Sequence, residues 1–359
     1  MAEAAIVLAG GFATRLRPLS YTKPKPLFPV LGRPVLDWVV ERVAEVAEPV
    51  VSARYLSYVI RNYINARWGG RVRLVEEDRP LGDGGAVVNV VKSLGLRGPI
   101  VVANGDVFTD ISVKEFWEFH RRSGAAVSMA LIEVPPGEVG RFGIAVLDEG
   151  GRIRRFVEKP KEPVSSNLAN AGFYIFEPEA MQEFPELNSG EVKIAKHIIP
   201  KLMEKFDVYG YVHRGLWFDI GTHSDYLKAN FAALDRCSAC RAEAPGVKII
   251  PPVYIGEEVV VSPGAVIGPY AVVGNRSKIG PHVRIRESVL MDGVVAEAGA
   301  YVHRSIVGEG TVLGRWTRLV EAVVADGVYV RDEVYIGRGA TVGPNREVDQ
   351  DVKDGEILP

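Results

Sequence analysis

The chain has 359 residues, of which 47% are hydrophobic and 25% are charged, and its formal net charge is −2 at pH 7. This composition is typical of a globular protein of two domains, and it excludes a polycationic surface for nucleic acid. No apolar run approaches the roughly 18 residues of a membrane span, and the N-terminus lacks the basic region of a signal peptide. We therefore expect a cytoplasmic protein with neither a membrane nor a nucleic-acid partner.

Two cysteines, Cys237 and Cys240, occur in a segment of small and polar residues. They are too few for a disulfide scaffold. Their C-x-x-C spacing would suit half a zinc site or a redox pair, but the sequence has neither a second cysteine pair nor a strand–helix redox context. We interpret both as small residues of a linker.

Residues 1–235 alternate strand and helix patterns. Hydrophobic spacing predicts strands at 4–8, 50–51, 72–75 and 100–103, and helices at 34–47, 55–68 and from the second glycine loop to residue 94. These units indicate a Rossmann-like α/β domain with a mostly parallel sheet. Ligands of such sheets bind beyond the carboxyl ends of the strands. Gly10-Gly11, Gly82 to Gly85 and Asn104-Gly105-Asp106 all follow strands in this way.

The loop after the first strand combines glycines with fixed cations, in the sequence LAGGFATRLRPLSYTKPKPLFPV at residues 8–30. Glycines let the backbone approach a phosphate, and cations such as Arg15 and Lys25 neutralise its charge. The spacing is neither that of a Walker A loop nor that of the dinucleotide fingerprint. It indicates another kind of polyphosphate-binding loop. The alternative is a strand–helix turn that needs glycine for its geometry, followed by surface lysines.

Two aspartates, Asp106 and Asp219, are candidate ligands of a divalent cation. Mg²⁺ prefers oxygen ligands and is usually held by one or two carboxylates together with substrate phosphates. Asp106 follows an apolar strand, and Asp219 lies between Phe218 and Ile220. Each could instead cap a helix or a turn.

A linker at 236–247 precedes a different pattern at 248–359. Aliphatic residues recur every six positions, at Ile255, Val261, Ile267, Val273, Ile279 and Ile285. The pattern predicts a left-handed β-helix of hexapeptide repeats with about five coils, in which the aliphatic side chains point inward. Two later shifts of register fit loops between coils. We expect the β-helix to form a homo-oligomer, because its flat faces and open ends suit self-association.

The motifs of the first half occur together with PLGDGGA at 80–86, FG at 142–143, EKP at 158–160, NAG at 170–172 and WFDIGT at 217–222. In this order they resemble the sugar-1-phosphate nucleotidylyltransferases, also called NDP-sugar pyrophosphorylases. The hexapeptide tail looks most like the mannose-1-phosphate guanylyltransferase branch of that family. The resemblance covers nearly the whole chain.

The resemblance implies a role for each matching residue. The NTP would contact Leu8, Gly10, Gly11, Glu77, Gly82 and Gly85. Arg15 and Lys25 would neutralise the triphosphate, while Asp106 and Asp219 would hold Mg²⁺ as the cofactor. The sugar would contact Gly143, Glu158 and Asn170, and its phosphate would bind Lys159. For Glu158-Lys159 the alternative is an exposed ion pair at a strand end.

Three positions depart from the pattern of the family. Ala13 replaces a usual glycine and would be strained if its φ is positive. Asp83-Gly84 replaces a usual Thr-Ala, and the carboxylate could repel phosphate or help to hold a cation. Ala195 occupies a position where an acidic residue is expected.

The function implied is nucleotidyl transfer from an NTP to a sugar-1-phosphate, preferably from GTP to mannose-1-phosphate. One alternative is a glucose-1-phosphate thymidylyl- or uridylyltransferase, and another is a regulatory homologue that senses NDP-sugar without reacting. A third is a bifunctional enzyme whose β-helix also acetylates an amino sugar. That chemistry needs a general base, for which His282 and His303 are the candidates.

Overall fold

The computed structural model describes residues 1–187, 190–238, 240 and 245–359. The chain forms two compact units, one of residues 1–11 with 35–218 and one of residues 12–34 with 219–359. Within the described residues, no helix combines the length and the apolar character that crossing a membrane requires.

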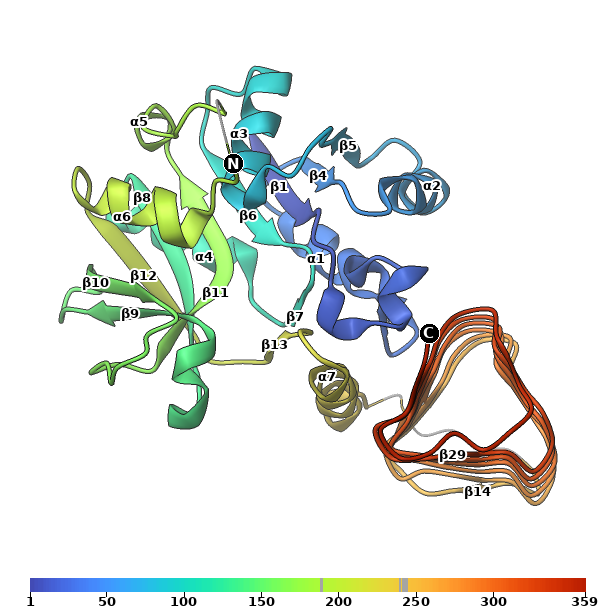
Figure 1. Ribbon diagram of the computed structural model, residues 1–359. Helices are drawn as coiled ribbons and strands as arrows, with labels where there is room; N and C mark the ends of the chain where they lie inside the picture. The colour runs from blue at the N-terminus through green and yellow to red at the C-terminus, as the bar shows by residue number, and fades with distance from the viewer. Residues whose placement is uncertain (188–189, 239, 241–244) are drawn as a thin grey trace. The chain divides into compact units, whose positions relative to one another are not determined.

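The first unit is built on a nine-stranded sheet (Figure 1). Its central strand β1 (Ala4–Ala9) is parallel to β4 (Pro49–Ala53) and β6 (Ile100–Asn104), and β5 (Arg73–Glu76) continues the parallel part beyond β4. All six residues of β1 are buried, as expected for a strand covered on both faces. The parallel, Rossmann-like part of the predicted sheet is confirmed.

Antiparallel pairing extends this sheet beyond β6. The strand β11 (Leu168–Phe176) runs antiparallel to β6, β8 and β9. The other strands of this part are β8 (Val127–Glu133), β9 (Gly143–Leu147), β10 (Ile153–Glu158) and β12 (Val208–His213). Of these, β10 is antiparallel to β9, and β12 is parallel to β8. The short strands β7 (Val107–Thr109) and β13 (Trp217–Asp219) lie outside the large sheet.

Helices cover the strands of the first unit. They are α1 (Val35–Val43), α2 (Ser57–Trp68), α3 (Gly82–Leu94), α4 (Val113–Ser123), α5 (Pro178–Met181) and α6 (Ile199–Met203), with a π-helix at Ile194–Ile198. Val87 and Val90 of α3 are buried in one core cluster with Ile6 of β1. The helix α4 begins at Ser112, whose hydroxyl accepts a hydrogen bond from Glu115 N and so caps the helix.

The second unit contains the cation-bearing loop and a long helix. Short 3₁₀ turns at Thr14–Leu16, Leu19–Tyr21 and Lys25–Leu27 lead to the hairpin of β2 (Pro29–Val30) and β3 (Arg33–Pro34), and α7 spans His223–Arg236. The buried hydroxyl of Tyr226 in α7 donates to Pro29 O at 2.6 Å, and Leu31 N donates to Asn230 Oδ1 at 3.1 Å. These contacts fix the end of the loop on α7.

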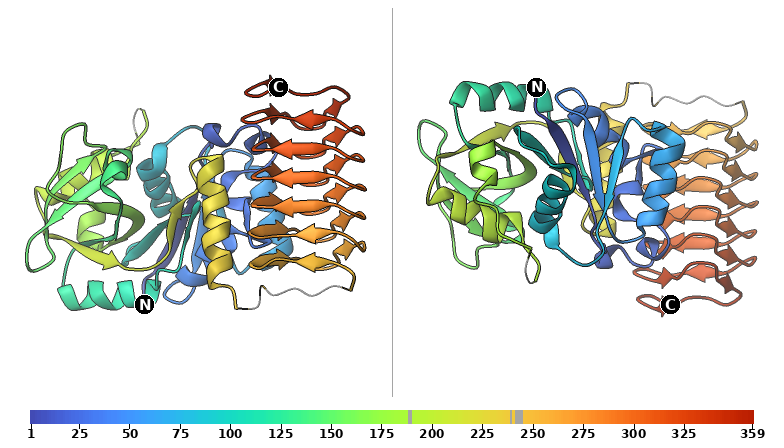
Figure 2. Two further views of the ribbon diagram at one scale, coloured as in Figure 1. Left: turned by 90° about the horizontal axis from the view of Figure 1, so that it is seen from below. Right: turned by 90° about the horizontal axis from the view of Figure 1, so that it is seen from above.

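The rest of the second unit is a left-handed β-helix with three parallel sheets of six, seven and six strands. Each coil has three sides (Figure 1), and the coils stack on one another (Figure 2). The sheet that starts at β14 (Lys248–Ile249) also contains β17 (Val266–Ile267), β20 (Arg284–Arg286), β23 (Tyr301–His303), β26 (Arg318–Val320) and β29 (Tyr335–Ile336). We call it the first sheet. Ile267, Ile279 and Ile285 are buried in the β-helix core, which confirms the inward direction predicted from the period of six.

The second and third sheets complete each coil. The second contains β15 (Val253–Ile255), β18 (Ala271–Val273), β21 (Ser288–Leu290), β24 (Ile306–Val307), β27 (Val323–Val324), β30 (Thr341–Val342) and β32 (Ile357–Leu358). The third contains β16 (Val260–Val261), β19 (Lys278–Ile279), β22 (Val295–Ala296), β25 (Val312–Leu313), β28 (Tyr329–Val330) and β31 (Glu347–Val348). The predicted number of about five coils was too low.

The shifts of register have a different cause from the loops predicted between coils. Ala271 lies four residues beyond Ile267, but Ser288 lies only three residues beyond its counterpart Ile285. The corner between the first and second sheets is therefore one residue shorter in the later coil. The sequence repeat slips because a corner residue is missing, and the stacking of the strands continues without an inserted loop.

The two cysteines form a disulfide between Cys237 and Cys240, with Cα atoms 5.3 Å apart. The interpretation of both as plain small residues of a linker was therefore wrong. Cys240 N also donates a hydrogen bond to Cys237 O, at 3.2 Å. The rest of the predicted linker at 236–247 includes residues 239 and 241–244, which lie outside the described residues.

Candidate active site

The first glycine loop leaves space on one side of its backbone. A Cβ atom at Gly11 would meet no atom within 4 Å, whereas a Cβ at Gly10 would lie 2.9 Å from Glu77 Oε1. Leu8 O accepts a hydrogen bond from Gly105 N at 2.8 Å, which places Asp106 next to the end of β1. Within the first unit, the structure therefore brings together Gly10, Glu77 and the segment that carries Asp106.

Glu77 lies at the end of β5 and faces Gly10. Its Oε1 accepts a hydrogen bond from Ser52 Oγ at 3.2 Å. Burial raises the pKa of Glu77, while the hydrogen bonds from Ser52 and Leu81 and the charge of Arg54 oppose the rise. A partly buried carboxylate here can accept hydrogen bonds from the N–H groups of a base.

The second glycine loop is packed against its own chain. Gly84 N and Gly85 N both donate to Val192 O, at 3.0 and 3.1 Å. A Cβ at Gly82 would lie 2.3 Å from the same oxygen, and Gly82 has a φ of +73°. The structure thus gives a reason for these glycines that the sequence analysis missed. The predicted nucleotide contacts of Gly82 and Gly85 stay a prediction.

Asp83 holds the second loop to the same segment. Its Oδ1 accepts hydrogen bonds from Ile194 N at 2.9 Å and from Gly84 N at 2.8 Å. Desolvation by the surrounding chain raises the pKa of Asp83, and these backbone hydrogen bonds oppose the rise. The departure from the family pattern at Asp83 therefore has a structural cause. Nothing in the structure explains Ala195.

The residues predicted for the sugar lie at neighbouring ends of β9, β10 and β11. Gly143 of β9 pairs with Glu158 of β10, and Ile144 pairs with Ala169 of β11, beside Asn170. Asn170 Nδ2 donates to the hydroxyl of Tyr174 at 2.6 Å.

A glycine is required at position 143, because a Cβ there would lie 2.5 Å from the ring of Phe156 and 2.6 Å from Glu158 Oε2. Desolvation raises the pKa of Glu158, and the charge of Lys159 opposes the rise. Sequence reasoning missed Tyr174, whose only signal was its spacing of four from Asn170 on the same strand.

The second unit groups Arg15, Lys25 and Asp219. The largely buried Lys25 lies with its Nζ 2.8 Å from Asp219 Oδ1. A Cβ at Gly221 would lie 3.1 Å from Arg15 Nη2 and 3.4 Å from Asp219 Oδ2. The sequence analysis assigned the two cations to phosphates and the carboxylate to a metal. It did not foresee that Lys25 and Asp219 form an ion pair.

The loop that carries these cations has one strained residue. Ala13, in place of the usual glycine, has a φ of 49° and a ψ of 43°. The strain expected for alanine at this position is therefore confirmed.

The two predicted metal ligands lie in different units, Asp106 in the first and Asp219 in the second. Among the described residues, no group of three or more His, Cys, Asp or Glu side chains could hold a metal ion. Mg²⁺ is commonly held by one or two carboxylates together with phosphate oxygens. The assignment of Asp106 and Asp219 to a metal stays a prediction.

Comparison with known proteins agrees with both folds. The family model described as Nucleotidyl transferase matches residues 4–236, and the model described as GMPPB C-terminal domain matches residues 249–358. The crystal structure of HddC from Yersinia pseudotuberculosis complexed with GMP-PN is 25% identical with a TM-score of 0.53, and the match covers 64% of this chain and 98% of that chain. The fold and the site define a nucleotide-dependent transferase, and the chain belongs to the nucleotidyl transferase family.

Several relatives are named as mannose-1-phosphate guanylyltransferases or guanyltransferases. The mannose-1-phosphate guanylyltransferase of Mycobacterium tuberculosis is 32% identical over 84% of this chain and 83% of its own length. Mannose-1-phosphate guanylyltransferase 1 of Arabidopsis thaliana is 30% identical over 99% of both chains. The putative mannose-1-phosphate guanyltransferase of Sulfolobus acidocaldarius is 34% identical over 72% of this chain and 73% of its own length.

Proposed function

We propose that the chain transfers a guanylyl group from GTP to mannose-1-phosphate and forms GDP-mannose and pyrophosphate. The observation that carries this proposal is the match to the Arabidopsis enzyme over 99% of both chains, because it includes the β-helix as well as the catalytic part. The glycine loop, the carboxylates and the sugar-site residues of this chain have the chemistry that the reaction requires.

The reaction joins two anions. An oxygen of the sugar phosphate attacks the α-phosphorus of GTP, a new P–O bond forms, and the bond from this phosphorus to the bridging oxygen breaks. The electron pair leaves with pyrophosphate. Such a displacement depends mainly on alignment and charge neutralisation. No nucleophilic side chain is needed.

The nucleotide would bind along the first glycine loop. Open space beside Gly11 leaves its backbone accessible to a phosphate. Arg15 and Lys25 would neutralise the triphosphate and the departing pyrophosphate. The carboxylate of Glu77 would accept hydrogen bonds from the N–H groups of guanine. A base without such donors would bind a carboxylate less well.

We propose Mg²⁺ as the cofactor, held by Asp106 and Asp219. The ion would supply positive charge at the phosphates. Lys25 in the free chain balances the charge of Asp219, with Nζ and Oδ1 2.8 Å apart. Removal of divalent cations with EDTA should abolish turnover, and added Mg²⁺ should restore it. Full turnover in EDTA would contradict this part of the proposal.

A screen of pyrophosphate release tests the reaction. The purified chain is given each of four NTPs with mannose-1-phosphate, glucose-1-phosphate and N-acetylglucosamine-1-phosphate. GTP with mannose-1-phosphate should give the highest kcat/KM. A higher value for dTTP or UTP with glucose-1-phosphate would favour the alternative transferases, and no release with any pair would favour a sensing homologue.

Lys25→Ala tests the role of the cation. Removal of one preorganised charge from a phosphoryl-transfer site lowers kcat by about 100-fold to 1,000-fold. Lys23→Ala is the matched control, because Lys23 pairs with Glu309 of the β-helix rather than with Asp219. The control should keep most of its activity. Similar rates in the two variants, with both folded by circular dichroism, would contradict the assignment.

We also propose that the protein acts in the cytoplasm as a homo-oligomer assembled through the β-helix. Arg304 pairs with both Glu287 and Glu321 at one corner of the β-helix, and the flat sheets are the surfaces where we expect contact. Light scattering after size exclusion should give a mass that is a multiple of 39.2 kDa. A mass equal to that of one chain at micromolar concentration would contradict the proposal.

A further inference from the structure

One corner of the β-helix carries an exposed tryptophan. The corner joins the third sheet to the first sheet and contains Gly264, His282, Gly299, Trp316 and Glu333, one residue in each successive coil and each with a positive φ. We call this row the Trp316 corner. The side chain of Trp316 is 59% exposed. Large aromatic side chains of this kind are enriched where a protein surface binds another molecule.

Glycine in the coil below makes room for the indole. A Cβ at Gly299 would lie 2.3 to 2.6 Å from atoms of the Trp316 ring. His282 lies over Gly264 in the same way, with ring atoms 2.7 to 2.9 Å from a Cβ placed there. The indole thus packs on Gly299 of the preceding coil, while more than half of its surface stays exposed to solvent.

A hollow of about 850 Å³ lies on the side of Trp316 that faces the first sheet. Arg284, Tyr301 and Arg318 line it in one row, since Arg284 pairs with Tyr301 and Tyr301 pairs with Arg318 in adjacent strands. Parallel strands lie about 4.8 Å apart, so the two arginines are separated by about 10 Å along the row. His282 and Glu333 lie at its rim.

The two arginines of this hollow are available to an anion. Among the described residues, neither Arg284 nor Arg318 forms an ion pair. At the opposite edge of the same sheet, Arg286 pairs with Glu287 at 2.6 Å and Arg304 pairs with the same glutamate at 3.1 Å. The guanidinium groups in the hollow therefore keep their capacity for charge-assisted, bidentate hydrogen bonds.

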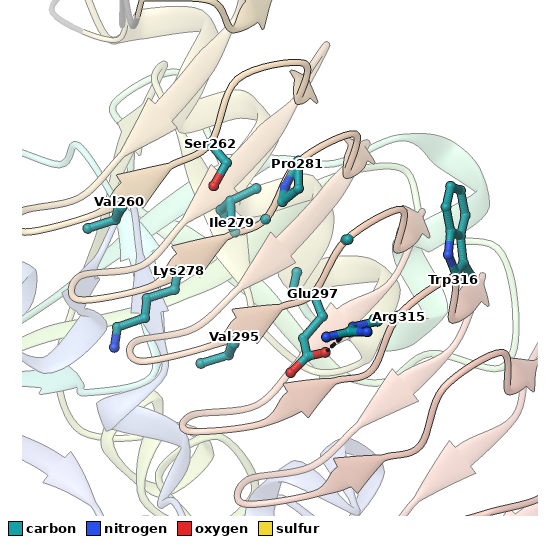
Figure 3. A pocket seen from close by; sticks show the side chains of 12 residues that line it. Val260, Ser262, Lys278, Ile279, Pro281, Val295, Glu297, Arg315 and Trp316 are labelled. Carbon is teal, nitrogen blue, oxygen red and sulfur yellow. Dashed lines mark ion pairs between the residues drawn. The ribbon is translucent and has the colours of Figure 1, made fainter.

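A second hollow, of about 700 Å³, lies on the other side of the indole, against the third sheet (Figure 3). Val260, Val295 and Pro281 give it an apolar part, Lys278 also lines it, and its Arg315 is engaged with Glu297 at 3.5 Å. The two arginines that can hold an anion by bidentate hydrogen bonds therefore lie in the hollow on the first-sheet side of the indole. A ligand with a planar ring and an anionic group at one end matches that hollow.

We propose that the Trp316 corner is a second binding site, for a guanine nucleotide. The base stacks on the rings of Trp316 and Tyr301, and its phosphates bind Arg284 and Arg318. Glu333 accepts the N–H groups of guanine, which adenine and pyrimidines do not present in the same pattern. The site goes beyond the proposed reaction and takes no part in it, although that reaction supplies guanine nucleotides to it.

Titration calorimetry with GDP tests this site in the full chain. The wild type should bind two GDP molecules per chain, one in the catalytic part and one at the Trp316 corner. Trp316→Asn and the double variant Arg284→Ser/Arg318→Ser should each bind one GDP in the catalytic part as the wild type does. Their affinity for GDP at the Trp316 corner should be at least tenfold weaker. Asparagine is chosen because it tolerates the positive φ of this position, 58° in Trp316.

Controls separate this site from the catalytic one. Arg346→Ser removes a cation of the β-helix outside both hollows and should leave two sites. Pyrophosphate should bind the Trp316 corner more weakly than GDP does, because it has no base to stack. If pyrophosphate and GDP bind there with equal affinity, the assignment to a nucleotide is overturned. If the proposed function is wrong and the catalytic part binds no GDP, the wild-type chain should bind one GDP, and Trp316→Asn should bind none. One GDP per chain that is unaffected by Trp316→Asn would overturn the second site.

Discussion

The two glycine loops of the first unit differ in what surrounds them. A Cβ at Gly11 would meet no atom within 4 Å, whereas a Cβ at Gly82 would lie 2.3 Å from Val192 O. The first loop is therefore open at Gly11. The second loop is packed against Val192, Ile194 and Ile198 of the same chain, which lie against Gly84, and Val192 also lies against Gly85.

This difference teaches that glycine loops of the same appearance in sequence can be open to solvent or packed against the chain. Both loops follow a parallel strand and precede a helical turn or a helix. In the second loop the N–H groups of Gly84 and Gly85 at the start of α3, which could otherwise hold a phosphate, are taken by Val192 O. The two loops should therefore respond differently to the same substitution.

Gly82→Ala should have the largest effect. The new Cβ would collide with a backbone oxygen, and the φ of +73° is unfavourable for alanine. We expect the free energy of unfolding to fall by about 3 kcal/mol or more. Urea unfolding followed by circular dichroism measures it. A loss below about 0.5 kcal/mol would show that the segment at Val192 moves away without cost.

Gly11→Ala is the matched test of the open loop. Stability should change by less than about 0.5 kcal/mol, because the Cβ meets no protein atom. The KM for GTP should rise by about tenfold, equivalent to about 1.4 kcal/mol, because the Cβ occupies the space of a phosphate. Steady-state pyrophosphate release measures the KM. An unchanged KM together with unchanged stability would remove the first loop from the nucleotide site.

The β-helix shows how much of the fold the sequence predicts. The period of six identified inward residues such as Ile267 and Ile279, because each coil repeats one local environment. The missing corner residue after Ile285 shifts that period without changing the stacking, so the sequence alone suggested a loop.

The candidate site was harder to predict because its contacts join distant segments. Gly143 and Glu158 were grouped from the resemblance to the family, and the structure pairs them in neighbouring strands. The hydrogen bond from Ile194 N to Asp83 spans 111 residues, and the ion pair of Lys25 with Asp219 spans 194. No local pattern reports such contacts. The disulfide of Cys237 with Cys240 is local, but it was missed because both residues were interpreted as small residues of a linker.

Glu77 offers a pH test of the first loop. A carboxylate accepts the N–H groups of guanine only when it is ionised. Burial raises the pKa of Glu77 above the ordinary value for glutamate, about 4.3, so acidification should protonate it earlier than an exposed glutamate.

In the wild type, the KM for GTP should therefore increase as the pH falls from 7 towards 5. In Glu77→Gln it should start higher and stay constant over this range. Initial rates in buffers of constant ionic strength measure the two profiles. Parallel profiles in wild type and variant would exclude Glu77 as a base contact.

Ala13→Gly should have the smallest effect and the opposite sign. Here a residue with a left-handed conformation, at a φ of 49°, is an alanine. Glycine relieves that strain, and we expect a gain of about 1 kcal/mol in the free energy of unfolding. Thermal unfolding should show a higher Tm. A lower Tm would mean that the methyl group of Ala13 contributes more through packing than its backbone costs.

A crystal structure of the chain with GTP, a non-reactive sugar phosphate and Mg²⁺ tests the central claim most directly. The account predicts the triphosphate against the backbone of Gly10 and Gly11, with Mg²⁺ bound by both Asp106 and Asp219 and by phosphate oxygens. Phosphates at the start of α3 in place of Val192 O, or a metal that contacts neither aspartate, would contradict it.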